Sequence, residues 1–426
     1  MKTFRYPNSA EWPQLIKRAI GNQQEVMKKV KPILEVVKKG KDKALQELTV
    51  KFDGVSLNSL AVSEDEIKKG CLEVDSKLKS AINSAIINIR QFHESQKLQI
   101  KKVETTPGVV CWQRNAPIEK VGLYIPGGSA PLFSTVLMLA IPATIAGCKE
   151  IVLCSPPDKK GKIHPAILFA AHLTGVTKIF KVGGAQAIAA MAYGTETIPK
   201  VDKIFGPGNS YVTAAKQMVT LDGVAIDLPA GPSEVMVMAD ESADPDFVAS
   251  DLLSQAEHGP DSQSILVTNS ESLAEAVTEK IDEQLQHLPR AQTTRKALQN
   301  SRIILLKTMD EMVAFSNSYA PEHLILAVRN PEYVSENIIN AGSVFLGHFT
   351  PESAGDYASG TNHTLPTYGY ARAYSGVNLD SFCKKITFQK ISEKGLKKLG
   401  PIIETMAAAE QLDAHKMAVS IRLKKI

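Results

Sequence analysis

The chain has 426 residues, of which 44% are hydrophobic, 22% charged and 6% aromatic. This length is enough for roughly two to four domains, and the composition is that of a folded globular protein, which excludes disordered, collagen-like and disulfide-scaffold proteins. The 49 basic and 45 acidic residues give a net charge of +4. That balance does not indicate a nucleic-acid partner.

The amino terminus, the most apolar window and the cysteines indicate a cytoplasmic protein. Residues 1–7 lack the apolar core of a signal peptide. The most apolar window, 130–147, is interrupted by Pro131 and Pro142, so we expect a buried helix after a strand and no membrane span. The five cysteines form no C-x-x-C pair, which is typical of free thiols in a reducing compartment.

Apolar spacing predicts helices up to about residue 100, for example over 33–50 and 82–92. From residue 121 the pattern changes to short apolar strands, each followed by a turn and a helix. One set of strands is predicted at 121–125, 151–154, 178–182 and 203–205, and a second set at 235–238, 265–267, 324–328 and 344–346. This alternation predicts two Rossmann-like α/β modules with mostly parallel sheets, whose ligands gather at the carboxyl ends of the strands. A helical tail is predicted over 404–419 as an arm that packs on another subunit.

One turn is suited to bind phosphate. Gly206-Pro207-Gly208-Asn209 opens a predicted helix, whose first N–H groups attract anions. Tyr211 stands where a dinucleotide fingerprint has its third small residue, so the motif is incomplete. Asp227 lies at a suitable distance downstream to contact a ribose, although acids occur at such spacing by chance.

Three polar groups could carry chemistry. Gln255 and His258 lie three apart on a predicted helix, as a pair of metal ligands or as an exposed polar face. Glu322-His323 precedes a strand and offers one base for water and one for a hydroxyl, unless both are surface residues. The segment 351–363 is rich in Gly, Asp, Asn and His, as loops at functional sites often are.

Several motifs together resemble the histidinol dehydrogenase family, from about residue 20 to the carboxyl terminus. They are VGLYIPGGSAP at 121–131, VGGAQAIAA at 182–190, FGPGN at 205–209, LPAGPSE at 228–234, LSQAEHG at 253–259, and the segment 351–370. The resemblance implies oxidation of L-histidinol through L-histidinal to L-histidine with two NAD. It also implies one zinc ion per site and a homodimer that shares its active sites.

The resemblance further implies an aldehyde-dehydrogenase-like fold with these parts. They are a helical arm over 1–20, a discontinuous main domain over 21–123 and 233–377 that carries the zinc and catalytic residues, an NAD-contacting domain over 124–232, and a small arm over 378–426 that reaches the partner subunit.

Roles carried over from the family fall on matching positions. By this resemblance the zinc ligands would be Gln255, His258 and Asp356, with His415 from the other subunit, and the catalytic pair would be Glu322 and His323. The substrate contacts are Ser233, Gln255, His258, His323, Asp356, Glu410 and His415, with His363 close by, and the NAD contacts are Tyr124, Gln186 and Asn209.

These roles are chemically coherent. A ligand set without a thiolate suits a zinc ion that orients the substrate, so other groups must move the protons. We expect His323 to take the alcohol proton and Glu322 to activate water for the aldehyde. No cysteine lies in the catalytic segments, which disfavours a thioester route. The alternatives are a zinc hydrolase with Glu322 as its base, and a nucleotide-binding or assembly protein without catalysis.

Overall fold

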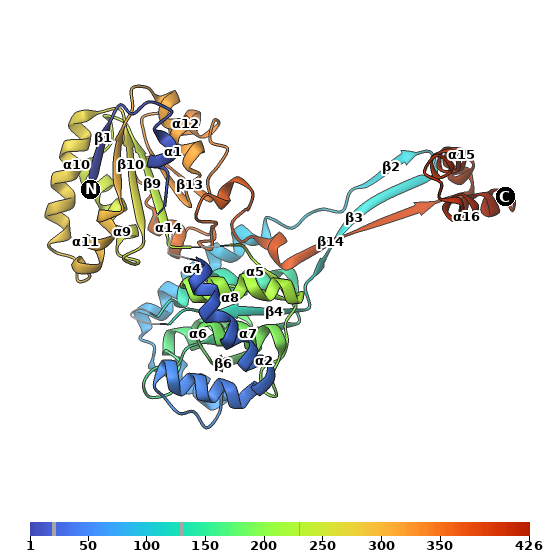
Figure 1. Cartoon of the computed structure of the whole chain (residues 1–426), viewed down its shortest axis with the longest axis horizontal. Coiled ribbons are helices and arrows are strands. Elements are labelled where there is room, and N and C mark those ends of the chain that lie inside the picture. The colour runs from blue at the N-terminus through green and yellow to red at the C-terminus, as the bar shows by residue number, and fades with distance from the viewer. Residues whose placement is uncertain (19–22, 128–130, 230) are drawn as a thin grey trace.

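The computed structural model describes residues 1–18, 23–127, 131–229 and 231–426. Two α/β modules lie next to each other, and a long arm projects away from both (Figure 1). The α/β class predicted from the sequence is therefore confirmed. Residues 128–130 and 230, which belong to the motifs quoted above, lie outside the described residues.

The first module contains a five-stranded parallel sheet in the order β6-β5-β4-β7-β8. Its strands are β4 (Lys120–Tyr124), β5 (Glu150–Ser155), β6 (Lys178–Lys181), β7 (Lys203–Phe205) and β8 (Ala225–Ile226). The chain order reverses between β4 and β7, and the carboxyl ends of the strands at such a switch point form a ligand-binding crevice.

Helices cover both faces of this sheet. They are α5 (Phe133–Ala146), α6 (Pro165–Thr174), α7 (Gly184–Tyr193) and α8 (Ser210–Val219), followed by the short η1 (Thr220–Asp222). Helix α5 is the apolar window discussed above, and its residues 134–143 are all buried. Among the described residues, no helix is long and apolar enough to span a membrane.

The amino-terminal helices belong to this first module. Helix α2 (Gln23–Asp53) packs on α7 and α8, α3 (Glu64–Glu73) on α6, and α4 (Ser76–Glu94) on α5. This differs from the expected division, which grouped 21–123 with the second module. The difference arises because the apolar faces of α2, α3 and α4 join the two hydrophobic clusters around the five-stranded sheet.

The second module contains a six-stranded parallel sheet in the order β1-β11-β10-β9-β12-β13. Its strands are β1 (Lys2–Arg5), β9 (Glu234–Ala239), β10 (Gln263–Thr268), β11 (Arg302–Leu305), β12 (His323–Ala327) and β13 (Ser343–Leu346). Every residue of β9, β10 and β12 is buried, as expected of central strands covered on both faces.

The helices of the second module are α1 (Trp12–Leu15), α9 (Pro245–Ala256), α10 (Glu271–Leu285), α11 (Ala291–Gln299), α12 (Met309–Tyr319), α13 (Pro331–Ser335) and α14 (Glu352–Tyr357). The amino terminus differs from the expected helical arm, because β1 pairs with β11 at the edge of this sheet. Strand β1 has no clear apolar alternation, so its partner strand determines its conformation.

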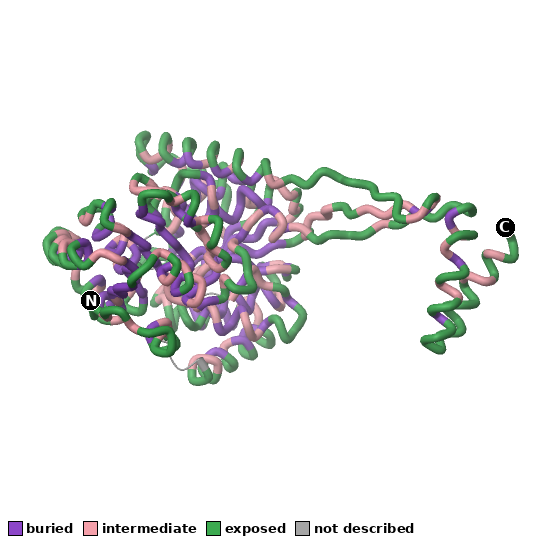
Figure 2. The backbone as a smooth tube through the Cα atoms, turned by 90° about the horizontal axis from the view of Figure 1, so that it is seen from above, coloured by how far each residue is buried: buried purple, intermediate pink, exposed green. Residues whose placement is uncertain are grey.

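The arm combines a three-stranded antiparallel sheet with two helices at its tip. The strands, in the order β14-β3-β2, are β2 (Lys102–Thr106), β3 (Val109–Pro117) and β14 (Cys383–Ile391), and the helices are α15 (Glu393–Ala409) and α16 (Asp413–Leu423). Short helical turns η2 (Tyr370–Arg372) and η3 (Leu379–Phe382) precede β14. The backbone of the arm is mostly exposed (Figure 2), and α16 has no buried residue.

Candidate active site

Glu322 and His323 lie at the amino end of β12 and are both buried. A carboxylate oxygen of Glu322 accepts a hydrogen bond from the main-chain N–H of Glu234 at 2.7 Å. The Nδ1 atom of His323 lies 3.1 Å from the main-chain carbonyl of Glu234. Because that carbonyl can only accept, a neutral His323 ring carries its proton on Nδ1 and leaves Nε2 free to act as a base.

The Nε2 atom of His323 is buried and has no hydrogen-bond partner among the described residues. The nearest carboxylate oxygen, of Asp356, is 3.6 Å away, which exceeds a normal hydrogen bond. On the other side of the ring, Nδ1 lies 3.7 Å from a carboxylate oxygen of Glu322. Leaving a buried nitrogen unpaired costs about 1–3 kcal/mol, so such an atom is expected where a substrate supplies the missing partner.

Neighbouring carboxylates determine the electrostatics of His323. Burial lowers the pKa of His323, but the negative charges of Glu352, Glu322 and Asp356 outweigh it and raise the pKa to about 10. Burial raises the pKa of Glu322 and that of Glu352, each to about 8. A cation bound among these carboxylates would offset their charge and lower the pKa of His323 toward that of a useful base.

A group of possible metal ligands lies next to this pair. The ligand atoms of His258, Glu352 and Asp356 are all within 4.8 Å of one another. His258 follows the end of α9, whereas Glu352 and Asp356 are one turn apart on α14. The polar segment that contains α14 was predicted to lie at a site. Glu352 itself was missed, although its i, i+4 spacing from Asp356 could have identified it.

Gln255 adds an amide group to this cluster, and the orientation of that amide bears on whether a cation fits there. Gln255 is buried, and its carboxamide can be placed either way round. With the nitrogen toward Glu352 it donates to that carboxylate, and its oxygen accepts from the N–H of Glu234 at 2.9 Å. With the oxygen toward Glu352, two acceptors face each other, an arrangement that a bound cation or a proton on Glu352 would stabilise. Amide oxygen, imidazole and carboxylates therefore form a donor set that fits zinc, although two carboxylates are one more than expected.

Glu410 and His415 do not reach this cluster within one chain. Glu410 ends α15 and His415 belongs to α16, and both are exposed on the arm. Figure 1 shows these helices at the tip of the arm, far from α14. Ser233, by contrast, directly precedes β9 and so lies next to Glu234.

His363 connects the two modules beside the ligand cluster. Its Nδ1 atom lies 3.0 Å from the main-chain carbonyl of Asp356, and its Nε2 atom lies 3.2 Å from the hydroxyl of Thr135 on α5. Burial lowers the pKa of His363, which favours the neutral ring. The segment that follows β4 is thereby fixed against the segment that carries Asp356.

The residues predicted to contact NAD follow three strands of the first module. Tyr124 ends β4, and its hydroxyl accepts the N–H of Gly184 at 3.1 Å. Gln186 lies in the first turn of α7, after β6, and is buried. Asn209 precedes α8, and its side-chain oxygen accepts two N–H groups of that helix. All three therefore lie at the carboxyl edge of the sheet, where β4 and β7 form the switch point.

The suggestion that Asp227 contacts a ribose is wrong. The side chain of Asp227 is 1% exposed and lies 2.5 Å from the ammonium group of Lys216. Its other oxygen accepts the N–H of Gly206 at 2.8 Å, and Lys216 donates to the carbonyl of Gly206 at 2.8 Å. A side chain at Gly206 (φ 122°) would meet the carbonyl oxygen of Tyr124 at 2.1 Å. This buried ion pair therefore fixes a turn that only glycine can make.

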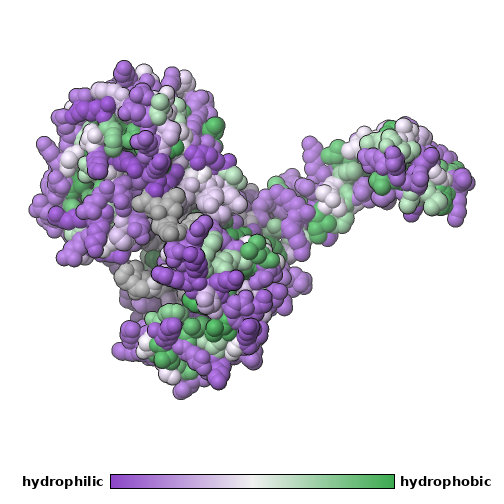
Figure 3. Space-filling model, in the orientation of Figure 1, coloured by the Kyte–Doolittle hydropathy of each residue, from purple (hydrophilic) through white to green (hydrophobic). Residues whose placement is uncertain are grey.

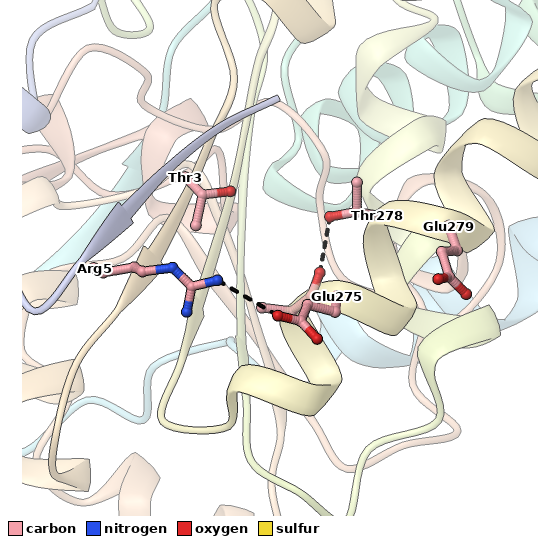
Figure 4. Close-up of a pocket in the computed structure, with 6 residues that line it drawn as sticks. Thr3, Arg5, Glu275, Thr278 and Glu279 are labelled. Atoms are coloured by element: carbon pink, nitrogen blue, oxygen red, sulfur yellow. Dashed lines mark hydrogen bonds and ion pairs between the residues drawn. The ribbon is translucent and has the colours of Figure 1, made fainter.

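A separate surface cavity lies between β1 and α10 and holds none of the predicted site residues. Within it Arg5 points toward Glu275, 3.5 Å away (Figure 4). Its lining residues are Thr3, Arg5, Ala274, Glu275, Thr278 and Glu279.

Comparison with known proteins assigns these features to one family. The profile of the family described as histidinol dehydrogenase matches residues 16–423. The chain is 62% identical to a histidinol dehydrogenase of Bacteroides thetaiotaomicron over 426 residues, covering all of both chains. It is 55% identical to that of Escherichia coli K12 over 414 residues, which cover 97% of this chain and 94% of the relative.

Solved structures agree with the sequence comparison. A crystal structure of a histidinol dehydrogenase from Elizabethkingia anophelis superposes with a TM-score of 0.98 at 57% identity, covering 100% of this chain and 98% of the other. An acetylating aldehyde dehydrogenase from Geobacillus thermoglucosidasius gives a TM-score of 0.50 at 15% identity, covering 86% of this chain and 97% of the other. That second similarity concerns the fold alone, and it confirms the aldehyde-dehydrogenase-like architecture expected from the sequence.

Proposed function

This chain belongs to the histidinol dehydrogenase family, and we propose that it oxidises L-histidinol to L-histidine through L-histidinal, the last two steps of histidine biosynthesis. The enzyme is an NAD-dependent oxidoreductase that acts on a CH–OH group. The family matches give no support to a zinc hydrolase or to a protein without catalysis.

The observation that carries the proposal is the buried, unpaired Nε2 atom of His323 beside Glu322 and the ligand cluster. An alcohol that is oxidised twice needs a base for its hydroxyl and a base for the water that adds to the aldehyde. A histidine and a carboxylate, both fixed by the main chain of Glu234, supply these two bases at one position.

Gln255, His258 and Asp356 would hold the zinc ion, with Glu352 beside them, and zinc bound there would orient the substrate by binding its nitrogen atoms. We expect His415 of the partner subunit to complete the ligand set. Ser233 of the same chain as the zinc ligands and Glu410 of the partner subunit would contact the substrate. Zinc bound there would offset the charge of these carboxylates and lower the pKa of His323, which favours the neutral ring that accepts a proton.

The proton steps follow from the side chains. His323 Nε2 accepts the hydroxyl proton of histidinol as the first hydride leaves its carbon. Glu322 then takes a proton from water as the water oxygen adds to the aldehyde carbon, and His323 returns its proton to the aldehyde oxygen. The neutral His323 takes a hydroxyl proton of the resulting hydrate as the second hydride leaves. NAD supplies the hydride acceptor for each oxidation. One histidinol (with its amino group protonated), one water and two NAD⁺ thus give one histidine zwitterion, two NADH and three protons.

NAD binding is proposed at the switch point of the first module. Tyr124, Gln186 and Asn209 lie at its carboxyl edge, and the hydrogen bond from Thr135 to His363 brings this edge next to the ligand cluster. A nicotinamide held there can face a substrate held by the second module.

The arm supports a homodimer with shared sites. Hydrophobic side chains are visible on its surface (Figure 3). The large exposed apolar residues of the arm include Ile386, Ile391, Ile402, Met406, Leu412, Met417 and Ile421. An arm that projects away from the two modules and exposes apolar side chains is suited to pack on a second copy of the chain. The five unpaired cysteines are typical of a reducing compartment and support a cytoplasmic location.

Hybrid dimers test both the site and its sharing. We would coexpress a His323→Ala chain with a His415→Asn chain, each inactive as a homodimer. In a hybrid, one site carries both defects and the other carries neither, so a random mixture regains about a quarter of the wild-type rate of histidinol-dependent NADH formation.

The control is a mixture of two separately purified homodimers that have not exchanged subunits, which stays inactive. A hybrid that regains no activity would contradict shared sites. Activity of the His323→Ala homodimer near the wild-type level would contradict the proposed base.

A further inference from the structure

We infer that Arg18 is a positioning residue for the catalytic pair, acting through Glu234 and through the turn before Glu322. This inference rests on the function proposed above. Arg18 lies between α1 and α2, distant in sequence from every residue that was predicted to belong to the site.

The guanidinium group of Arg18 joins two segments. Its Nε and Nη2 atoms donate to the two carboxylate oxygens of Glu234 at 2.8 and 2.9 Å. The same Nη2 donates to the carbonyl of Tyr319 at 2.9 Å, and the guanidinium stacks 3.8 Å above the centre of the Tyr319 ring. The side chains of Arg18 and Glu234 are only 10% and 2% exposed. A buried two-pronged pair of this kind has a single favourable geometry.

Glu234 transmits this geometry to the catalytic pair. Its main-chain N–H donates to Glu322, and its main-chain carbonyl faces Nδ1 of His323. Its carboxylate accepts a third hydrogen bond, from the N–H of Tyr368 at 2.8 Å. The residue that orients both proposed bases is therefore itself fixed by its side chain, chiefly by Arg18.

Arg18 also fixes the turn that leads into Glu322. Ala320 has φ 55°, a left-handed conformation that is uncommon for alanine and needs support from its surroundings. Arg18 supports it by binding the carbonyl of Tyr319, and it lies 3.4 Å from that of Ala320. Two residues later the chain reaches Glu322. The Arg18 side chain thus fixes the positions of the first residues of both β9 and β12. The distance between base and substrate depends on these positions.

The test compares Arg18→Ala and Arg18→Lys with Arg5→Ala. Arg5 is a matched control, because it forms exposed ion pairs from the same amino-terminal segment. We expect Arg18→Ala to lower kcat for both oxidations by about 10- to 100-fold, the cost of displacing reacting groups by about 1 Å. The KM for histidinol and the zinc content stay near wild type, because Arg18 touches neither. Arg18→Lys keeps the charge and gives an intermediate kcat, and added guanidinium partly restores Arg18→Ala.

Each outcome either supports or overturns the positioning role of Arg18. Loss of kcat without loss of zinc, together with rescue by guanidinium, supports positioning. A folded Arg18→Ala enzyme with the kcat of Arg5→Ala would overturn it, as would a loss explained wholly by a smaller folded fraction. If Arg18→Ala does not fold, the kcat of Arg18→Lys at an unchanged KM decides. A wild-type enzyme without histidinol-dependent NADH formation would instead overturn the proposed function, and this inference with it.

Discussion

The two modules face the candidate site with opposite ends of their strands. The first presents the carboxyl ends of β4, β6 and β7, where parallel sheets usually bind ligands. The second presents the amino ends of β9 and β12, where Glu234, Glu322 and His323 lie. The expectation that ligands gather at carboxyl ends therefore does not fit the second sheet, and for the first sheet it stays a prediction.

The modules also differ in how they use buried polar groups. In the first, Lys216 and Asp227 are paired with each other and with a glycine turn, so their charges serve the fold. In the second, His323 keeps an unpaired nitrogen among carboxylates whose pKa values burial raises. A cofactor surface requires a fixed shape, whereas proton transfer requires polar atoms that the protein itself leaves unpaired.

The largest expected effect is that of Glu322→Gln, which tests whether the buried polar groups of the second module serve proton transfer. Glutamine keeps the shape and still accepts the N–H of Glu234, but it cannot take a proton from water. We expect histidinal oxidation to slow by about 10²- to 10⁴-fold and histidinol oxidation far less. Glu336→Gln, on the exposed surface, is the control. Equal losses in both steps would show that Glu322 is not specific to the hydration step.

The variant Lys216→Met tests whether the buried ion pair stabilises the fold of the first module. It leaves the buried Asp227 carboxylate without its partner, which costs about 3–5 kcal/mol of the free energy of unfolding. Urea denaturation followed by circular dichroism measures the loss. Lys149→Met removes an exposed pair with Glu119 and should cost about 1 kcal/mol or less. Equal unfolding midpoints for the two variants would mean that the buried pair does not support the module.

The smallest effect concerns the contact between the modules. Nδ1 of His93 on α4 lies 2.8 Å from a carbonyl of its own helix, and Nε2 faces the amide of Asn362 at 3.4 Å. Burial lowers the pKa of His93 below 6.5. Just below pH 6.5, His93 is therefore protonated to a greater extent in the unfolded chain than in the folded chain. This contribution to stability is present above pH 6.5 and is lost as the pH falls.

His93→Gln removes the titrating group, so its thermal midpoint should fall less steeply than that of the wild type between pH 6.5 and 5. Parallel curves for the two proteins would show that His93 carries no such linkage. His164→Gln, which leaves His93 in place, is the control.

The sequence predicted the repeating part of the fold. Eight of the strands were placed by short apolar runs, because most of them are buried on both faces and must therefore be apolar throughout; β13, at the sheet edge, is the exception. Strand β1 was missed, because its pairing with β11 depends on the edge of a finished sheet. The grouping of α2, α3 and α4 was missed for a similar reason, since an amphipathic face does not reveal which sheet it will cover.

The candidate site was predictable only where motifs were distinctive. Gln255, His258, Glu322, His323 and Asp356 come from three segments of the chain, and the structure brings them together. Arg18 was missed, because a lone arginine in sequence gives no sign of what it contacts. Glu352 was missed although its i, i+4 spacing from Asp356 offered a signal. Asp227 was suggested for a ribose, but spacing alone does not show that a lysine on the preceding helix α8 already binds it.

The most direct test of the account is the stoichiometry of the complete reaction. Purified protein loaded with zinc is given a limiting amount of L-histidinol and excess NAD, and NADH is measured by absorbance while histidine and histidinal are separated and quantified. We expect two NADH for each histidinol, with histidine as the product and no accumulated aldehyde. One NADH per histidinol with free histidinal, or no NADH at all, would contradict it.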